Sequence, residues 1–187
     1  MKVKLRGIAS VQFGYYEKPG VVGRVKYLQA KHFNEYSQFI DEVDDWVDID
    51  DKNESHLLQN GDVLFVGKGS RNFAAVYTWS YGLSIASSIF YVIRIKNQEK
   101  FLPEFLCLLF NSSAYQAQLQ SLGAGSSILS IRKQELEDLH IEFPSLEKQR
   151  ELIRLSSLHQ EEIQIYNKII HDKQLLVQQI INDLIKE

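Results

Sequence analysis

The amino-acid sequence predicts an α+β chain: one globular domain with a mixed or antiparallel sheet and short helices, followed by one long C-terminal α-helix that forms a coiled coil. Three observations lead to this prediction. Residues 1–100 are rich in β-branched and aromatic residues and are interrupted by glycines. A helical apolar pattern with a proline at its start follows over 103–121. Residues 145–186 contain neither proline nor glycine.

Four strands are expected in the first hundred residues, at Val21–Leu28, Val63–Val66, Ala74–Trp79 and Ile89–Ile95. The turn-forming triplet Asn60-Gly61-Asp62 directly precedes the second of them and favours a strand start there. The last strand is apolar except for Arg94, so it should be largely buried.

The helical part begins with Pro103 and Glu104, which suit the first turn of a helix. The stretch 123–127 is glycine- and serine-rich and is expected to be a loop. A short helix is predicted over Arg132–Leu139 with Ser130 as its cap, and a brief strand over His140–Phe143.

Ser145 can cap the long helix, which places the domain boundary between 1–144 and 145–187. About 40 helical residues make a rod of about 60 Å. Apolar residues follow a heptad pattern along it, at Ile163, Tyr166, Ile170, Val177, Ile180 and Leu184. A small domain cannot cover such a long face, so we expect these residues to pair with a partner helix. The alternative is a helix that folds back on its own domain.

Composition is that of a globular protein, with 44% hydrophobic and 24% charged residues. The net charge of −3 is unevenly spread, because residues 1–40 sum to +5 and residues 41–54 to −7. A local positive field is therefore expected, with the acidic run as a solvated loop away from any phosphate. Cys107 lies in an apolar run and is expected to act as a small buried hydrophobe. A single cysteine and an N-terminus without a signal-peptide core indicate a cytoplasmic protein with no membrane segment.

Six short motifs occur in the order typical of one family. They are Leu5–Val11 followed by Gly14, Asn60–Val66, Pro103–Leu106, Gly125–Ile128, Leu136–Phe143 and Pro144–Gln149. The chain resembles the specificity subunits of type I restriction–modification enzymes over nearly its whole length. Typical members carry two recognition domains and two long helices, whereas this chain has one of each and no internal repeat. It is either a natural half-subunit or a fragment of a longer protein.

The resemblance implies that residues 1–144 are a DNA target-recognition domain and that residues 145–187 are a dimerising spacer helix. The expected partners are double-stranded DNA, a methyltransferase subunit that carries the S-adenosylmethionine chemistry, and a restriction subunit. A homodimer would read a palindromic target in two parts. The chain itself would perform no catalysis and bind no cofactor.

Candidate DNA-binding residues fall into three groups. Phosphate contacts are expected from Lys18, Arg24, Lys26 and Lys31, with Tyr15 and Tyr16 beside them on a loop. Base contacts are expected from Lys68, Ser70, Arg71 and Asn72, because arginine can grip guanine and asparagine can grip adenine. Backbone N–H groups at Ser126 and Ser127 could hold a phosphate. We therefore expect Arg71 to affect sequence preference and Lys26 to affect all sequences alike.

Enzyme functions are less well supported by the residues. Phe65-Val66-Gly67-Lys68-Gly69 fits a methyltransferase cofactor pattern, but a strand rather than a helix is predicted after it. A phosphate-binding P-loop fails on spacing. None of the five histidines has another ligand at metal spacing, so no metal site is predicted, although composition alone leaves a metal-dependent nuclease open.

Two hypotheses remain from different classes. The first is the DNA-specificity subunit, and the second is a coiled-coil assembly module whose degenerate recognition domain binds only protein. The salt dependence of DNA affinity distinguishes the two hypotheses. Phosphate contacts release counterions, so the affinity of a DNA-binding protein falls steeply as the salt concentration rises.

Overall fold

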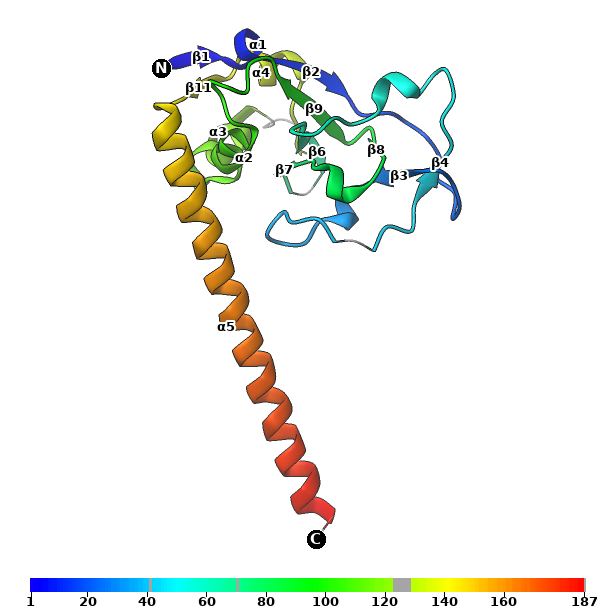
Figure 1. Ribbon diagram of the computed structural model, residues 1–187, viewed down its shortest axis with the longest axis vertical. Coiled ribbons are helices and arrows are strands. Elements are labelled where there is room, and N and C mark those ends of the chain that lie inside the picture. Colours follow the sequence, from blue (N-terminus) through cyan, green and yellow to red (C-terminus); the bar gives the residue numbers. More distant parts are fainter. Residues whose placement is uncertain (41, 70, 123–128, 187) are drawn as a thin grey trace. The chain divides into compact units, whose positions relative to one another are not determined.

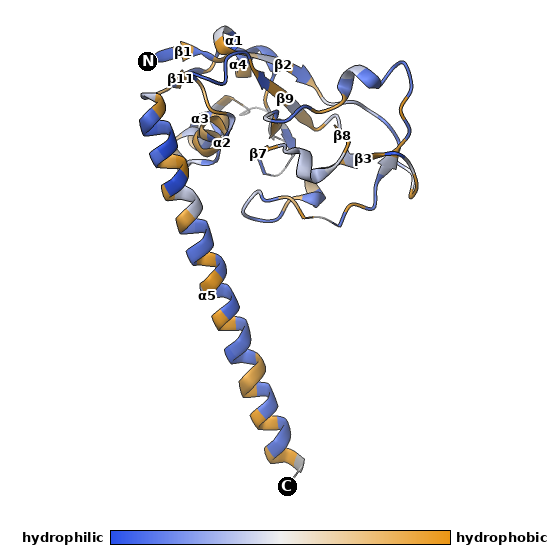
Figure 2. Ribbon diagram, in the orientation of Figure 1, coloured by the Kyte–Doolittle hydropathy of each residue, from blue (hydrophilic) through white to orange (hydrophobic). Residues whose placement is uncertain are grey.

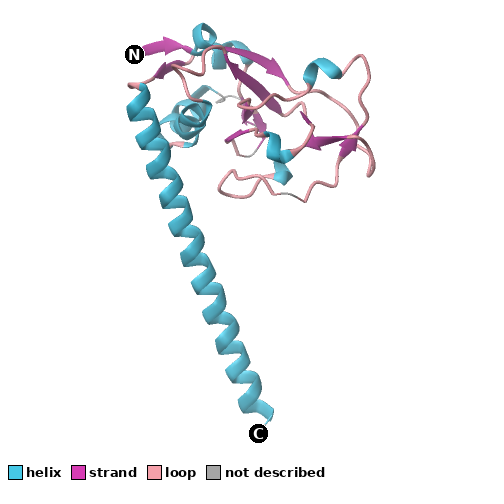
Figure 3. Cartoon of the chain, in the orientation of Figure 1, coloured by secondary structure: helices cyan, strands magenta, loops and turns pink. Residues whose placement is uncertain are grey.

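The computed structural model describes residues 1–40, 42–69, 71–122 and 129–186. They fall into two compact units, Met1–Gln149 and Arg150–Glu187. The first unit holds every described strand and the short helices, and the second is helical throughout (Figure 3). The predicted α+β class with a long C-terminal helix is confirmed.

A four-stranded antiparallel sheet forms the centre of the first unit, in the order β2-β9-β5-β7 (Figure 1). Its strands are β2 (Ala9–Phe13), β5 (Val63–Val66), β7 (Ala74–Val76) and β9 (Phe90–Ile95). The prediction for β5 is confirmed residue for residue, and that for β9 to within one residue. The predicted strand Ala74–Trp79 ends early, at Val76, and a short 3-10 helix takes over its last residue.

Three smaller sheets surround the central one. β3 (Val25–Leu28) pairs antiparallel with β4 (Trp46–Val47) and parallel with β8 (Ser84–Ala86). β1 (Lys2–Lys4) pairs with β11 (His140–Glu142), and β6 (Lys68–Gly69) with β10 (Leu129–Ser130), both antiparallel. The 3-10 helices are Ala30–His32, Glu54–His56 and Trp79–Tyr81, and α1 is Leu5–Ile8.

The predicted strand Val21–Leu28 is extended only in its second half. Val21 and Val22 instead occupy a turn, where 86% and 83% of their surfaces are exposed. The turn is tied to β4, because the N–H of Gly20 donates to the Trp46 carbonyl and the N–H of Trp46 donates back, both at 2.9 Å. Apolar, β-branched residues predicted a strand here, but backbone pairing with β4 makes a turn.

Both faces of β5 are covered, which explains its uninterrupted apolar sequence. On one face the ring of Phe65 lies 5.2 Å from that of Phe110 on α2 (Pro103–Asn111). On the other face Leu64 and Val66 join a core cluster with Phe33, Phe73 and Phe90, among others. The N–H of Ala74 on the edge strand β7 donates to the Asn111 side-chain oxygen, and its carbonyl accepts from the Asn111 amide, both at 2.8 Å.

The single helix predicted over 103–121 is two helices, α2 and α3 (Ser113–Leu122). They separate at Ser112, whose backbone is extended and whose hydroxyl donates to the Leu109 carbonyl at 2.7 Å. A serine side chain that bonds to nearby backbone competes with helical hydrogen bonds, and the apolar pattern does not reveal this.

The short helix predicted near residue 132 is α4 (Lys133–Asp138), and the cap predicted at Ser130 is wrong. Arg132 occupies the capping position, and its N–H donates to the Glu135 carboxylate at 2.9 Å, while Ser130 lies in β10. The cap predicted for the long helix is confirmed: α5 spans Leu146–Lys186, and the Ser145 hydroxyl accepts the N–H of Lys148 at 3.3 Å.

An ion pair joins β5 to β9 at one end of the sheet. The Asp62 carboxylate is only 1% exposed and accepts two hydrogen bonds of 2.7 Å, from Nε and Nη2 of Arg94. It also accepts the N–H of Gln59 at 2.8 Å, which closes the turn before β5. The aspartate of the Asn60–Val66 motif therefore holds the strand pairing rather than a ligand.

Gln149 plays a similar part at the start of α5. Its side chain is 1% exposed and makes three hydrogen bonds. The amide nitrogen donates to the carbonyls of Lys100 and Pro144, and the amide oxygen accepts the N–H of Leu102 at 3.0 Å. The glutamine of the Pro144–Gln149 motif thus binds the first turn of α5 to the loop before α2.

Replacing Arg94 with methionine should lower the free energy of unfolding by about 3–5 kcal/mol, because the Asp62 carboxylate would stay buried without its cation. Urea unfolding followed by the fluorescence of Trp46 and Trp79, both in the first unit, measures this loss. Arg24→Met is the matched control, since Arg24 is exposed and should matter by less than about 0.5 kcal/mol. Equal losses in the two variants would contradict the structural role of the pair.

Replacing Gln149 with alanine should cost about 1–3 kcal/mol, because one N–H and two carbonyl groups would lose their partner in a buried place. The same unfolding experiment applies. Gln174→Ala, at an exposed position of α5, is the control and should leave the urea midpoint unchanged. A midpoint for Gln149→Ala that matches the control would show that this anchor carries no stability.

Candidate nucleic-acid interface

Four segments of the chain meet at one end of the central sheet. In this antiparallel arrangement β2 and β5 end where β7 and β9 begin. We call the described residues gathered there, 13–16, 67–69, 71–72, 87–89 and 129–132, the loop end. The N–H of Gly14 donates to the Phe90 carbonyl at 2.9 Å, and that of Gly67 to the Ile89 carbonyl at 3.0 Å.

Two glycines make this close approach possible. A Cβ atom on Gly14 would lie 2.1 Å from the carbonyl oxygen of Ser87, and one on Gly67 would lie 2.2 Å from the ring of Tyr91. No other residue fits at either position without moving backbone or an aromatic ring. The close approach that Gly67 permits is thus to an aromatic side chain of the same domain.

The first residues of the 67–72 segment pair with the residues that follow position 128. β6 pairs with β10 in the register Lys68↔Ser130, and the N–H of Ile131 donates to the Gly67 carbonyl at 3.0 Å. The hydroxyl of Tyr91 adds a 2.7 Å hydrogen bond to the Ile131 carbonyl. Residues 67–69 and 129–131 therefore lie side by side. The candidates Ser70, Ser126 and Ser127 lie outside the described residues.

Lys68 and Arg71 are the exposed cations of segment 67–72, and among the described residues neither has a carboxylate within 4.0 Å. Arg71 is held by neutral oxygens, since its Nη2 donates to the Asn34 carbonyl at 3.0 Å and to the Ser37 hydroxyl at 3.1 Å. Its guanidinium carbon lies 4.7 Å from the centroid of the Phe73 ring.

Asn72 differs from its neighbours, because its side chain is only 6% exposed. Its amide nitrogen donates to the Val66 carbonyl at 2.6 Å, while its amide oxygen is buried without a hydrogen-bond partner among the described residues. A side chain this deeply buried cannot reach a base edge from where it lies. The structure thus places one predicted base reader inside the fold.

The acidic run, predicted to be a solvated loop, contains a short strand and contacts the basic segment. β4 lies inside the acidic run and pairs with β3 of the basic segment, with Lys26 opposite Trp46. The ammonium of Lys31 lies 2.7 Å from a carboxylate oxygen of both Asp44 and Asp45. The hydrogen bond from Lys31, followed by that from His32, lowers the pKa of Asp44 to about 2. Lys31 is therefore neutralised locally and offers little to a phosphate.

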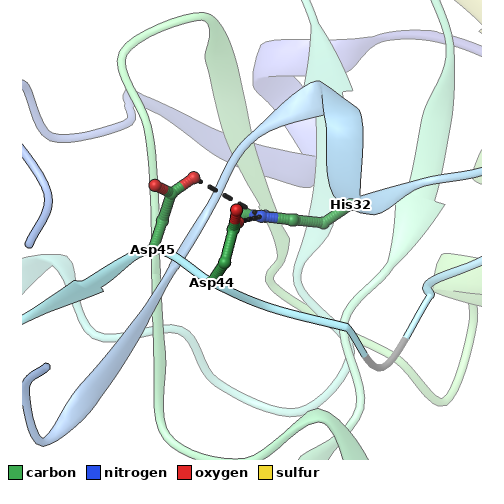
Figure 4. Close-up of side chains that lie close together, drawn as sticks. All are labelled: His32, Asp44 and Asp45. Carbon is green, nitrogen blue, oxygen red and sulfur yellow. Dashed lines mark hydrogen bonds and ion pairs between the residues drawn. The ribbon is translucent and has the colours of Figure 1, made fainter. Parts of the chain in front are cut away.

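His32, Asp44 and Asp45 are the one group among the described residues whose ligand atoms lie close enough to hold a metal, all within 4.8 Å (Figure 4). Nδ1 of His32 accepts the N–H of Gln29 at 3.0 Å, so the ring proton belongs on Nε2, which faces Asp44 at 3.3 Å. Nε2 then has no lone pair for an ion, and Lys31 supplies the positive charge instead. Sequence reasoning missed this group because β3–β4 pairing brings together residues twelve or more positions apart.

Of the other cationic candidates, Lys18 and Arg24 lie on the β2–β3 connection and Lys26 lies in β3. Lys18 and Arg24 are exposed on either side of the turn at Val21 and Val22. Lys26 is half-buried, and its ammonium lies 5.6 Å from the centroid of the Phe39 ring.

The two tyrosine candidates differ in exposure. Tyr16 is 82% exposed. Tyr15 is half-buried and packs against the His56 ring at 4.9 Å. Of this pair, only Tyr16 presents its ring fully to solvent.

The second unit presents the predicted dimerisation residues. Ile163 is half-buried, and the other five positions of the heptad pattern are exposed on α5. Ile169, Leu176 and Ile181 are also exposed and widen the stripe, and Ile165, Leu175 and Ile185 are further exposed apolar residues of the helix. Apolar segments recur along the full length of this helix (Figure 2). Among the described residues, no helix combines the length and the apolar character needed to cross a bilayer.

Comparison with known proteins adds the family. Residues 21–172 match the family model of the type I restriction modification DNA specificity domain, which covers most of the chain. A search of curated proteins finds no significant match.

Solved structures share the fold at low sequence identity. The S subunit of the type I restriction–modification system from M. genitalium has a TM-score of 0.61 at 13% identity, over 88% of this chain and 40% of that one. The HsdS subunit from Thermoanaerobacter tengcongensis has a TM-score of 0.61 at 19% identity, over 90% and 44%. A chain from a study of complex assembly and conformational transition in the type I R-M system reaches 0.65 at 16% identity, over 96% and 43%.

This chain therefore spans less than half the length of the structures that it matches. The family model, rather than the identity to any one structure, carries the assignment, and it agrees with the motifs found in the sequence. The chain belongs to the type I restriction modification DNA specificity domain family.

Proposed function

We propose that this chain binds double-stranded DNA through the loop end of its central sheet and directs a methyltransferase subunit, and a restriction subunit, to a target in two parts. The chain supplies sequence choice, and the chemistry belongs to its partners. Family membership supports this role. The observation that carries the location is the pair of exposed cations in one segment of the loop end, Lys68 and Arg71, neither of which has a carboxylate partner among the described residues.

The proposed interface includes the candidates that the structure leaves exposed beside the loop end. Tyr16, Lys18 and Arg24 lie on the β2–β3 connection, which leaves the loop end at Gly14. Duplex DNA carries about one negative charge per 1.7 Å of its axis, so exposed cations on neighbouring loops meet several phosphates. Lys31 and Asn72 are not part of the proposed interface, because their side chains bind other groups within the domain.

The proposed dimer places two such domains on one duplex. The 41-residue helix α5 exposes a wide apolar stripe to water. Pairing with a second copy would remove this apolar surface from water, which favours the dimer. A twofold pair presents the same recognition surface twice, so the target is palindromic and its spacing is set by the paired helices.

The second candidate function is a coiled-coil assembly module that binds only protein. The same wide stripe on α5 favours it, as does the overall charge of −3. The two functions differ in what the first unit contacts, and salt dependence of DNA binding distinguishes them.

Removing the charge of Lys68 should weaken DNA binding alike for all sequences. We expect Lys68→Ala to lower the slope of log affinity against log salt by about 0.9, because one phosphate contact is lost. Fluorescence anisotropy with a duplex pool of randomised sequence measures this without knowledge of the target. Lys100→Ala, an exposed lysine outside the loop end, is the control and should keep the wild-type slope. A wild-type chain whose binding ignores salt would overturn the DNA proposal in favour of the protein-binding module.

Charges on the apolar stripe should break the dimer. Ile170→Glu combined with Val177→Glu places a carboxylate at two core positions of the heptad pattern, and each loses the roughly 2 kcal/mol that a buried aliphatic side chain contributes. Sedimentation velocity should show a dimer for the wild-type chain and a monomer for the variant. His171→Glu adds the same kind of charge next to the stripe and should stay dimeric. A monomeric wild-type chain at every concentration would end the dimer proposal.

A further inference from the structure

The turn over residues 34–38 is closed by its own hydrogen bonds and accepts hydrogen bonds from Arg71. The turn is not one of the segments of the loop end. The side-chain oxygen of Asn34 accepts the N–H groups of Tyr36 and Gln38, both at 2.9 Å. The backbone N–H of Asn34 donates to the Gln38 carbonyl, and the N–H of Ser37 donates to the Asn34 carbonyl. These bonds close the turn without any help from Arg71.

Ser37 adopts a backbone conformation that serine rarely takes. Its φ is +64°, and among the described residues it is the only non-glycine residue with positive φ. Glycine or asparagine would adopt this conformation with less strain. A strained serine that persists in a rigid turn suggests a use for its hydroxyl, and that hydroxyl accepts a hydrogen bond from Nη2 of Arg71 at 3.1 Å.

Arg71 keeps its charge while it is held. The contacts that fix its guanidinium are the Asn34 carbonyl, the Ser37 hydroxyl and the face of Phe73, all of them neutral. Arg94 and Lys31, in contrast, are bonded to carboxylates. A cation fixed by neutral groups has already lost its conformational freedom but remains available to an anion.

The nitrogen that is held decides what Arg71 can bind. Nη2 donates to both Asn34 and Ser37 and is therefore engaged within the domain. Nη2 belongs to both edges through which a guanidinium makes paired hydrogen bonds, as the Nε and Nη2 contacts of Arg94 with Asp62 illustrate. Among the described residues Nε and Nη1 of Arg71 have no hydrogen-bond partner, and these two nitrogens do not share an edge. A single contact to a phosphate oxygen fits them, and a paired contact to guanine does not.

We propose that Ser37 is a positioning residue that holds Arg71 for one contact with a DNA backbone phosphate. Arg71 then contributes to affinity for every sequence, in place of the base-reading role that its type and loop predict. The inference rests on the proposed DNA-binding function and adds to it the turn over residues 34–38, which lies more than 30 residues from Arg71 in the sequence.

The test compares Ser37→Gly, Ser37→Asn and Arg71→Ala in the full chain, with a duplex pool of randomised sequence as the probe. Arg71→Ala should weaken binding roughly tenfold at low salt and lower the salt slope by about 0.9. Ser37→Gly should weaken binding roughly threefold, because it frees the arginine side chain. The same variant should keep or raise the melting temperature, because glycine relieves the positive φ. Ser37→Asn keeps an acceptor and tolerates that φ, so it should restore most of the affinity.

The opposite movements of affinity and melting temperature in Ser37→Gly distinguish positioning from a general structural role. The inference is overturned if Ser37→Gly binds like wild type, if its affinity falls only as its melting temperature falls, or if Arg71→Ala keeps the wild-type salt slope. It is also overturned if Arg71→Ala changes the preferred sequence in a selection from the pool. If the wild-type chain fails to bind DNA, the proposed function fails first, and the salt series of the wild type alone reveals this.

Discussion

The pairing of β5 with β9 is the constraint on which the rest of the recognition unit depends. Register places Val63 opposite Ile93, so Asp62 faces Arg94 at one end of this pair, and their ion pair closes it there. A slip of one residue would turn every side chain of β5 to the other face of the sheet and separate the two charges. At the opposite end the same register sets Gly67 against the Tyr91 ring, and this contact places the loop end. A buried carboxylate far from the candidate interface therefore determines where the candidate interface forms.

Which charges this protein offers to a ligand depends on which side chains form ion pairs within the chain, and not on the net charge. Lys31 and Arg94 are both cationic, and both are consumed by carboxylates that hold strands or loops together. Lys68 and Arg71 lack such partners among the described residues, and Arg71 is held instead by neutral oxygens and an aromatic ring. A surface that attracts DNA can thus exist on a chain with a net charge of −3, because phosphate responds to the local field. The acidic run takes part in this organisation, since Asp44 and Asp45 pair with Lys31.

The motifs shared with the specificity family serve the fold more than the ligand. Asp62 closes a turn and a strand pair, Gln149 fastens the first turn of α5, and Gly67 lets an aromatic ring approach the backbone. The surroundings of a buried scaffold residue are set by the fold, whereas an exposed residue at a binding surface is constrained by the ligand. This contrast explains why the family could be identified from short motifs although the structures it matches are less than 20% identical. It also explains why the same motifs identify none of the base contacts.

Sequence alone determined the features that depend on neighbours along the chain. β5 is a run of four apolar residues after a turn, and α5 lacks any helix breaker, so local propensity and periodicity suffice for both. The break at Ser112, the cap at Arg132 and the turn at Val21 were not predictable, because each depends on a hydrogen bond made to backbone or side chains that periodicity does not describe. Tertiary structure alone decided which cations stay free, that Asn72 is buried, and that Ser37 meets Arg71. Strand pairing joins residues far apart in the sequence, and the availability of a side chain depends on the partner it finds there.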